Sequence, residues 1–419
     1  MLDSTRKDLI SRLKEQTQNH ADLTNVDDER LESLIAEILD NEKSTCPELW
    51  SLNFREKRQI IEGVFDSIRR LGVLGTIISD SDVTEVMING YKDIFIEKHG
   101  RLYKHESQFE SSKELETIIT KFVSKAGRAV NESQPIVDFQ LEDGSRVNVV
   151  MKPIALDGPI VTIRRFSNTP IEIGDLISYG SITEEAASML KLLVEAKYNI
   201  FISGGTGSGK TTFLNVLSNF IPSDERIVTI EDTAELQINN IDNLVRLETR
   251  NAGVFGNGAI TMRDLIKTAL RMRPGRIVVG EVRGCEALDM LQAMNTGHDG
   301  SLSTGHANST ADILSRLETM VLQGADGLPL EAVRQQIASA IDIFVHLSRV
   351  RDKSRKVLEI VEVVGYNSKK RAIELNSLYE FKESEESTKD NVIGSLCRTK
   401  NPMRNIGKLK SAGLGIEEG

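Results

Sequence analysis

The chain has 419 residues, in which 52 Lys and Arg stand against 62 Asp and Glu, so the formal net charge is −10. This acidic balance argues against a protein that coats duplex DNA, because such a protein needs a surplus of cations to displace counterions, although a local basic channel is compatible with it. With 39% hydrophobic and 27% charged residues, the composition is typical of a soluble chain of two or three globular domains, at roughly 150 residues per domain.

The three cysteines, Cys46, Cys285 and Cys397, are far apart and form no CxxC pair. A disulfide framework or a zinc site is therefore not expected, and a reducing compartment fits. No stretch approaches the ~18 unbroken apolar residues of a membrane-spanning helix, and the first residues, MLDSTRKDLISRLKEQ, lack the apolar core of a signal peptide. We expect neither secretion nor a membrane span, while peripheral attachment through a membrane protein stays open.

Residues 1–75 are predicted to form an N-terminal helical extension, because Leu and Ile recur three and four positions apart among charges in STRKDLISRLKEQ and DDERLESLIAEILD. Such an extension either packs one apolar stripe or docks a partner. Residues 76–166 are predicted to form a smaller α+β domain. Asn89-Gly90 marks a turn between β-branched and aromatic runs, a helical pattern follows in KELETIITKFVSKAGRAV, and two further strand runs end near Arg165.

Residues 167–172, which begin SNTP, are the best candidate for an interdomain linker. Residues 173–378 then alternate helical patterns with strongly apolar strand runs such as YNIFISGG, RIVTIED and RIVVGEV. Strands this apolar are expected in a sheet that helices cover on both faces, which is the α/β fold class. Residues 379–419 are polar and contain Gly, Lys and Ser, so we expect a polar C-terminal tail that is flexible or weakly ordered.

The segment GGTGSGKT matches the phosphate-loop pattern GxxxxGK[ST]. Glycines let successive N–H groups point at phosphate oxygens, and the following helix directs its positive dipole end at the same anion. The pattern predicts that Lys210 reaches the β- and γ-phosphates and that the Thr211 hydroxyl binds Mg²⁺. A buried-strand run precedes the motif and an apolar-faced helix pattern follows it, which is the order the motif requires. The predicted nucleotide-binding residues are Gly204, Gly205, Thr206, Gly207, Ser208, Gly209, Lys210, Thr211 and Thr212.

Hydrolysis needs, besides a phosphate loop, an acid that holds the metal and a group that orients water. RIVTIEDTAEL has Glu231 and Asp232 at the end of a strand run with Glu235 shortly after, and RIVVGEVRG has Glu281 at the end of another. Ligands of open α/β sheets bind beyond the carboxyl ends of the strands, so both clusters are expected to face the phosphate loop. The alternative for each is a strand-end acid in a surface turn.

NTGHDGSLSTGHANS carries His298 and His306, two of the six histidines of the chain, within a run of small residues. A zinc site is not favoured, because no cysteine or converging acid lies nearby in the sequence. Each histidine is a candidate either for a structural position or for a role at the γ-phosphate end or between subunits.

The order of these motifs, TGSGKTT, TIEDTAEL, VVGEVRG and NTGHDGSLSTGHANS, resembles the Walker A, Asp box, Walker B and His box of the type II/IV secretion ATPases. The likeness is greatest to the Tad/Flp-pilus assembly ATPases, relatives of the VirB11-like and type IV pilus motors, and it runs from about Ser81 to His346. It implies a hexameric cytoplasmic ATPase, peripheral at the inner membrane, with a PAS-like N-terminal domain hinged to a RecA-like domain. It also implies ATP and Mg²⁺ as cofactors, an inner-membrane platform protein as partner, and pilus assembly or protein secretion as the work done.

The resemblance assigns roles by position. Thr211 and Glu281 support Mg²⁺ and its waters, while Glu231 and Glu235 are candidates for orienting the attacking water, and the choice of base stays open. Gly280 before Glu281 departs from the usual acid pattern of phosphate-loop proteins, so Glu281 is a candidate to act on Mg²⁺ through water. The other residues that the resemblance assigns to the site are Lys210, Asp232 and His298 for the nucleotide and His306 for catalysis.

Phosphoryl transfer leaves charge on the equatorial oxygens, which an arginine stabilises, and the phosphate-loop segment itself contains none. In the family, arginines of the N-terminal domain reach the phosphates across the domain cleft, so that domain closure gates hydrolysis. The candidates of this first set are Arg146 in DGSRVNV and Arg164 and Arg165 in VTIRRF. Arg271 and Arg273 in LRMRPGRIVVGE form a second set, contributed between subunits.

Alternative functions stay open at this point. A conjugation motor of the VirB11-like branch would transfer DNA, although the acidic charge and the lack of interleaved basic and aromatic residues predict no direct nucleic-acid contact. A nucleotide-dependent scaffold would change shape without turnover, but the complete set of acids and arginines disfavours it. A small-molecule kinase is weaker still, since the sequence shows no lid or acceptor pocket.

Overall fold

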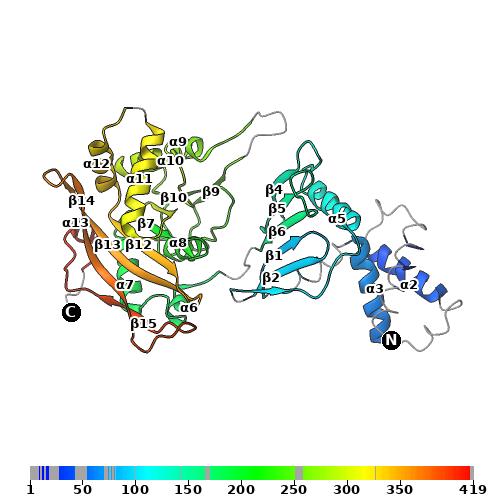
Figure 1. Cartoon of the computed structure of the whole chain (residues 1–419). Helices are drawn as coiled ribbons and strands as arrows, with labels where there is room; N and C mark the ends of the chain where they lie inside the picture. The colour runs from blue at the N-terminus through cyan, green and yellow to red at the C-terminus, as the bar shows by residue number, and fades with distance from the viewer. Residues whose placement is uncertain are drawn as a thin grey trace. The chain divides into compact units, whose positions relative to one another are not determined.

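The computed structural model (Figure 1) describes residues 9, 12–13, 16–17, 28–42, 54–69, 74, 77, 80, 82–98, 100–141, 143–165, 170–250, 258–325 and 327–415. The chain divides into two compact units, Met1–Ser167 and Asn168–Gly419. Of the predicted linker 167–172, residues 167–169 lie outside the described part, and α6 (Ile173–Ser178) follows it directly.

Two amphipathic helices share a small apolar core in the first unit. α2 (Asp28–Glu42) and α3 (Phe54–Arg69) pack together through residues three and four positions apart. Leu31 and Ile35 of α2 are fully buried, as is Val64 of α3. The spacing in the sequence therefore turns one apolar stripe inward and leaves the charged residues to solvent.

The rest of the first unit is a six-stranded antiparallel sheet in the order β3-β2-β1-β6-β5-β4. α5 (Ser112–Lys125) covers one face, against inward side chains that alternate along each strand, as Val147 and Val149 do. Gly90, which the sequence predicts in a turn, has a φ of +71°. The strands are β1 (Val83–Asn89), β2 (Asp93–Lys98), β3 (Arg101–Lys104), β4 (Ile136–Gln140), β5 (Arg146–Val150) and β6 (Ile160–Arg164).

The second unit is built on a nine-stranded sheet in the order β15-β14-β13-β12-β7-β11-β10-β8-β9. Neighbours from β12 to β9 pair in parallel, and those from β12 to β15 pair antiparallel. Every residue of β7 is buried, so helices must cover both faces of the sheet, and the predicted α/β class is confirmed. The strands are β7 (Ile200–Gly204), β8 (Ile227–Glu231), β9 (Leu244–Glu248), β10 (Arg276–Val279), β11 (Leu302–His306), β12 (Ile343–Arg349), β13 (Arg355–Asn367), β14 (Ala372–Glu383) and β15 (Gly394–Arg398).

Separate apolar clusters lie on the two faces of this sheet. Ile200 and Ile202 of β7 belong to one cluster, and Phe201 between them belongs to the other, because successive strand side chains point to opposite faces. The first cluster includes α7 (Glu184–Glu195) and α8 (Lys210–Ser218), and the second includes α9 (Met262–Ala269), α10 (Glu286–Asn295), α11 (Thr310–Gly324) and α12 (Leu330–Ala340). Within the described ranges, no helix has the length and apolar character needed to cross a membrane.

Residues 379–415 are not the weakly ordered tail that their composition suggests. β14 continues to Glu383, β15 pairs with it at the edge of the sheet, and α13 (Gly407–Ser411) packs against the first apolar cluster. Leu396 and Leu409 anchor these elements and are 4% and 1% exposed. The expectation of a loose tail is therefore wrong here. Its polar composition misleads because an edge strand and a short helix each need only one apolar anchor, while their other residues face solvent.

Candidate functional site

The segment Gly204–Thr211 joins the end of β7 to the start of α8. Gly207 and Gly209 have φ values of +70° and +92°, which residues with a Cβ rarely adopt. At Gly204 the constraint is space, because a Cβ there would lie 2.5 Å from Leu347 O. The loop thus stands at the amino end of α8, where the helix dipole attracts an anion.

Lys210, the first residue of α8, is 8% exposed. Its Nζ donates to Gly205 O at 3.1 Å and lies 3.2 Å from His306 Nδ1. His306 ends β11, and the parallel register with β7 pairs it with Gly204. The amine therefore bends back over the phosphate loop instead of extending into solvent.

His306 links Lys210 to Glu281. Its Nε2 lies 2.8 Å from Glu281 Oε1, just beyond the end of β10. Burial lowers the pKa of His306, the Lys210 charge acts in the same direction, and the Glu281 charge opposes them. A neutral imidazole can accept from the ammonium at Nδ1 and present Nε2–H to the carboxylate. The three side chains form a continuous polar chain from the phosphate loop to an acid on a neighbouring strand end.

Arg283 binds the other oxygen of Glu281. Its Nε and Nη2 donate to Glu281 Oε2 at 2.8 and 2.6 Å, and its Nη1 lies 3.3 Å from Asp232 Oδ2. Burial acts to lower the pKa of Arg283, but the hydrogen bond and the charge of Glu281 outweigh it, so the pKa is raised. Arg283 joins the acid that follows β10 to the acid that follows β8.

Glu231, the last residue of β8, is 3% exposed. Its Oε1 accepts from the backbone N–H groups of Glu235 and Leu236 at 3.0 Å each, and its Oε2 has no hydrogen-bond partner within the described ranges. Burial raises the pKa of Glu231 to about 7, against the lowering effect of the two N–H groups. Gly280 makes room for the side chain, since a Cβ there would lie 3.0 Å from Glu231 Cγ. A carboxyl with such a pKa can accept a proton near neutral pH, as a general base must.

An open cavity of about 700 Å³ lies beside the loop, a size that holds a small ligand. Its walls come from the phosphate loop, the end of β11, the segment after β10 and the first half of α11. The lining residues are Gly205, Thr206, Arg283, His306, Ala307, Asn308, Asp312, Ser315 and Arg316.

The structure also brings to the loop four arginines that the sequence patterns do not single out. Arg283 is part of VVGEVRG, so that motif carried a signal for it, and Arg316 follows the His box on α11. Arg349 and Arg355 come from the ends of β12 and β13, and 148 residues separate Arg355 from its contact at Gly207. These two residues lie near the loop because β12 pairs with β7 and β13 pairs with β12.

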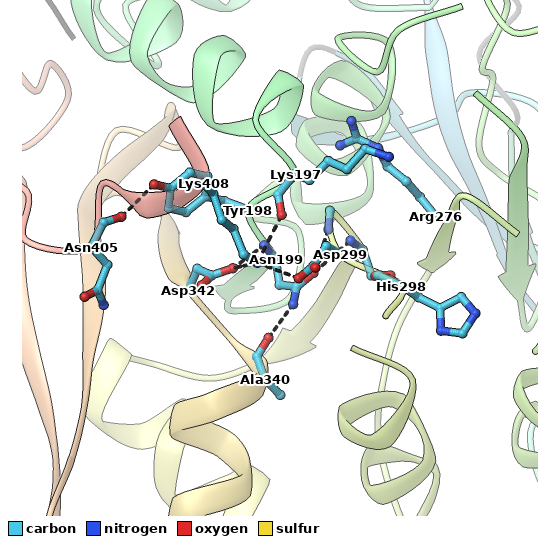
Figure 2. Close-up of polar contacts among 12 residues, drawn as sticks. Lys197, Tyr198, Asn199, Arg276, His298, Asp299, Ala340, Asp342, Asn405 and Lys408 are labelled. Carbon is cyan, nitrogen blue, oxygen red and sulfur yellow. Dashed lines mark hydrogen bonds and ion pairs between the residues drawn. The ribbon is translucent and has the colours of Figure 1, made fainter. Parts of the chain in front are cut away.

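His298 lies at the opposite edge of the sheet. It precedes β11, at the amino end of that strand, whereas His306 stands at the carboxyl end. Its Nδ1 lies 3.2 Å from Ala293 O, and Figure 2 shows the ring pointing away from the contacts around Asn199. His298 therefore lies away from the phosphate loop of its own unit.

Arg271 and Arg273 lie between α9 and β10, at the same amino edge, and both are exposed. The next arginine, Arg276, is fully buried and donates from Nη2 to Glu225 Oε1 at 2.7 Å (Figure 2 shows Arg276). Arg276 thus serves the fold, while Arg271 and Arg273 could reach a phosphate loop only in another copy of the chain.

The other predicted arginines belong to the first unit. Arg146 and Arg164 stand opposite each other on β5 and β6, on the sheet face away from α5. Arg165 differs, because its Nη1 donates to Asp80 O and, at 3.1 Å, to Val83 O, and so fixes the start of β1.

The donor set suits Mg²⁺ bound together with phosphates. Mg²⁺ prefers oxygen ligands and takes only one or two from the protein when phosphates supply others. In the part of the chain that the structure describes, no group of three or more His, Cys, Asp or Glu could hold a metal alone. Thr211, next to Lys210 on α8, and Glu281 offer a hydroxyl and a carboxylate, and the buried Glu231 Oε2 is an additional acceptor.

A phosphate loop at the carboxyl edge of a parallel α/β sheet, with acids at the ends of neighbouring strands, is the arrangement typical of the P-loop class. Within that class, the chain belongs to the type II/IV secretion system protein family, whose model matches residues 70–400. The family indicated by the order of the motifs is confirmed.

The chain is 33% identical over 294 residues to the conjugal transfer protein TrbB of Rhizobium radiobacter, covering 70% of this chain and 87% of that protein. It is 32% identical over 308 residues to the type IV secretion system protein PtlH of Bordetella pertussis, covering 68% and 91%. Among solved structures, the ATPase DotB of Legionella pneumophila is similar with a TM-score of 0.50 and 22% identity, covering 72% and 81%. DotB of Yersinia pseudotuberculosis has a TM-score of 0.51 and 17% identity, covering 74% and 81%. The similarity to both DotB chains is a similarity of fold alone.

Proposed function

We propose that this protein is an ATPase that hydrolyses ATP bound at Gly204–Thr211. The free energy of hydrolysis drives a domain motion, and this motion powers a secretion or pilus-assembly machine. The observation that carries the proposal is the chain of contacts from Lys210 through His306 to Glu281. A scaffold that only binds nucleotide needs the lysine but has no use for an acid connected to it in this way.

Each group has a chemical task in this proposal. The loop and Lys210 bind the phosphates, and Thr211 and Glu281 hold Mg²⁺, which neutralises phosphate charge when bound. Glu231 accepts the proton of the attacking water, because its pKa of about 7 leaves it able to do so at neutral pH. Glu235, whose N–H binds Glu231, is the second candidate for orienting that water.

The finer assignment is a cytoplasmic homohexamer of the Tad/Flp-pilus type, peripheral at the inner membrane beneath a platform protein. In it a PAS-like first unit closes on a RecA-like second unit, and Arg146 and Arg164 bring positive charge to the phosphates. Arg271 and His298, at the amino edge of the sheet, then act between subunits. The order of motifs and the family membership support this assignment.

A motor for DNA transfer is the second candidate, favoured by the name of one relative, the conjugal transfer protein TrbB. The net charge of −10 speaks against direct DNA binding. ATP turnover that rises on addition of DNA, and loses that response as salt increases, would favour this candidate over pilus assembly.

The test of the ATPase itself is steady-state phosphate release by the full chain and by Glu281→Gln. We expect turnover in the wild type and a loss on the order of 10²-fold or more in the variant, as for the removal of one preorganised group. Glu184→Gln, which changes an exposed acid at the start of α7, is the matched control. Equal rates in wild type and Glu281→Gln would support the scaffold instead.

A further inference from the structure

The β12–β13 hairpin runs beside the phosphate loop. β12 pairs in parallel with β7, with Leu347 opposite Gly204, and then continues beyond the end of β7. The chain turns back at residues 350–354, closed by a hydrogen bond from Val350 N to Ser354 O, and enters β13. Figure 1 shows β12 next to β7, with β13 beyond it. The tip of the hairpin is thereby carried to the flank of the loop that faces away from β11.

Arg349 and Arg355, at the two ends of the hairpin turn, lie against this flank. Arg355 Nε donates to Gly207 O at 2.9 Å. Arg355 Cδ lies 3.3 Å from the position that a Cβ of Gly209 would take, and Arg349 Nη1 lies 3.7 Å from that of Gly207. These contacts lie on the side of the loop along which β12 runs, whereas Lys210 Nζ turns toward His306 at the end of β11, on the other side. The two arginines therefore lie on the opposite side of the loop from His306.

The groups suited to the terminal phosphate lie on the other flank. His306, Glu281 and Glu231 stand at or just beyond the ends of β11, β10 and β8, which follow one another on one side of β7. β12 is the neighbour of β7 on the opposite side. A nucleotide held at its middle by the loop, with its γ-phosphate toward these groups, directs its ribose and base toward β12.

We propose that Arg349 and Arg355 bind the nucleoside end of the nucleotide, with a guanidinium plane against the face of the base. The proposal rests on the proposed nucleotide site at Gly204–Thr211 and adds the half of the ligand that the loop does not contact. Guanidinium groups stack on aromatic rings and donate hydrogen bonds in their own plane, and the Arg355 side chain is exposed. The hairpin thus selects a nucleotide over a free polyphosphate.

The test compares two probes, ADP and inorganic tripolyphosphate, by isothermal titration calorimetry of the full chain with Mg²⁺ present. For the double variant Arg349→Ala/Arg355→Ala we expect the Kd of ADP to rise roughly tenfold, the size of one or two cation–π contacts. The Kd of tripolyphosphate should change by less than about twofold. Equal weakening for both probes would mean that the arginines only shape the phosphate loop, and unchanged ADP binding would also overturn the proposal.

Arg351→Ala is the matched control, since Arg351 lies on the same turn but donates to Glu383 Oε2 and Thr388 O at 2.9 Å each. It should bind both probes as the wild type does. Arg355→Lys keeps the charge without the plane and should weaken ADP alone. These measurements need no turnover. A wild-type chain that binds ADP but releases no phosphate contradicts only the ATPase proposal, and one that binds neither probe contradicts both.

Discussion

At the scale of single residues, Glu231 combines a buried carboxyl with a loop that donates two N–H groups to only one of its oxygens. The folded-state pKa of about 7 lies above the ordinary 4.5, so the folded chain binds more protons than the unfolded chain between these values. Stability is therefore lost as pH rises through this window. The cost is absent below about pH 4.5 and complete above about pH 7.

Glu231→Gln should remove this cost, because the amide is neutral at every pH and can still accept from both N–H groups. Without nucleotide, we expect the variant to unfold at a higher temperature than the wild type at pH 8, by roughly 3 kcal/mol in free energy, and to match it at pH 4. Thermal unfolding at the two pH values checks this. Glu248→Gln, an exposed acid opposite Glu231 on β9, controls for the change in net charge. A difference that does not depend on pH would disprove the account of Glu231.

His306 offers a second prediction at this scale. His306→Asn shortens the side chain that lies between Lys210 and Glu281, while Lys210 keeps its contact with Gly205 O. Nucleotide affinity should stay within about threefold, and kcat should fall roughly 10- to 100-fold, as for the loss of one positioning contact. The split between KM and kcat is the readout, with Lys210→Ala as the variant that loses affinity itself. An unchanged kcat in His306→Asn would show that the contact chain has no part in turnover.

At the scale of elements, the sequence predicts what local spacing and composition determine. The apolar run of β7, the glycines of the loop and the apolar face of α8 are adjacent in the chain, and a continuous apolar run or helical spacing suffices to recognise them. The acids at the ends of β8 and β10 could also be predicted to face the loop, because parallel strands bring their carboxyl ends to one edge. The approach of Arg349 and Arg355 to the phosphate loop could not be predicted in this way, since it depends on which strand lies next to β7.

The C-terminal elements were missed for a related reason. α13 is held by polar contacts as well as by Leu409, and a charged residue in a polar sequence carries no signal of burial. Lys408 Nζ lies 2.7 Å from both Asp342 Oδ2 and Asp299 Oδ1, and Tyr198 OH donates to Asn405 O at 2.6 Å (Figure 2). Burial raises the pKa of Asp342, and Lys408 acts against this rise. The helix thus supplies a cation to this partly buried acid.

Lys408→Met should accordingly destabilise the second unit by about 2 kcal/mol, because it leaves Asp342 without that cation while keeping most of the apolar stem. Adding Asp342→Asn should restore much of the loss, which identifies the pair as the cause. Lys410→Met, at an exposed position of the same helix, should have little effect. Thermal or denaturant unfolding measures all four chains. If the double variant is no more stable than Lys408→Met, another contact of α13 is responsible.

At the scale of the whole molecule, the proposed machinery is divided between the two units. The phosphate loop and the acids belong to the second unit, whereas the opposed pair Arg146 and Arg164 belongs to the first. In the proposed mechanism, an arginine of the first unit that reaches the phosphates couples turnover to domain motion, because it would stabilise the charge only when the units close. This division is what a mechanical ATPase needs and what a static nucleotide-binding protein does not.

Arg164→Ala should therefore bind nucleotide almost normally but turn it over more slowly, by on the order of 10³-fold if it acts as an arginine finger. Steady-state ATPase and ADP titration measure the two effects separately. Arg101→Ala, at an exposed position on β3 of the same sheet, is the control for loss of charge. The mass of the assembly, determined with and without a non-hydrolysable ATP analogue, completes the test. If the units close within a ring, the analogue should stabilise an oligomer in both the wild type and the variant. An affinity loss with normal kcat would make Arg164 a ground-state contact, and a monomeric wild type without turnover would remove the basis for coupling closure to hydrolysis.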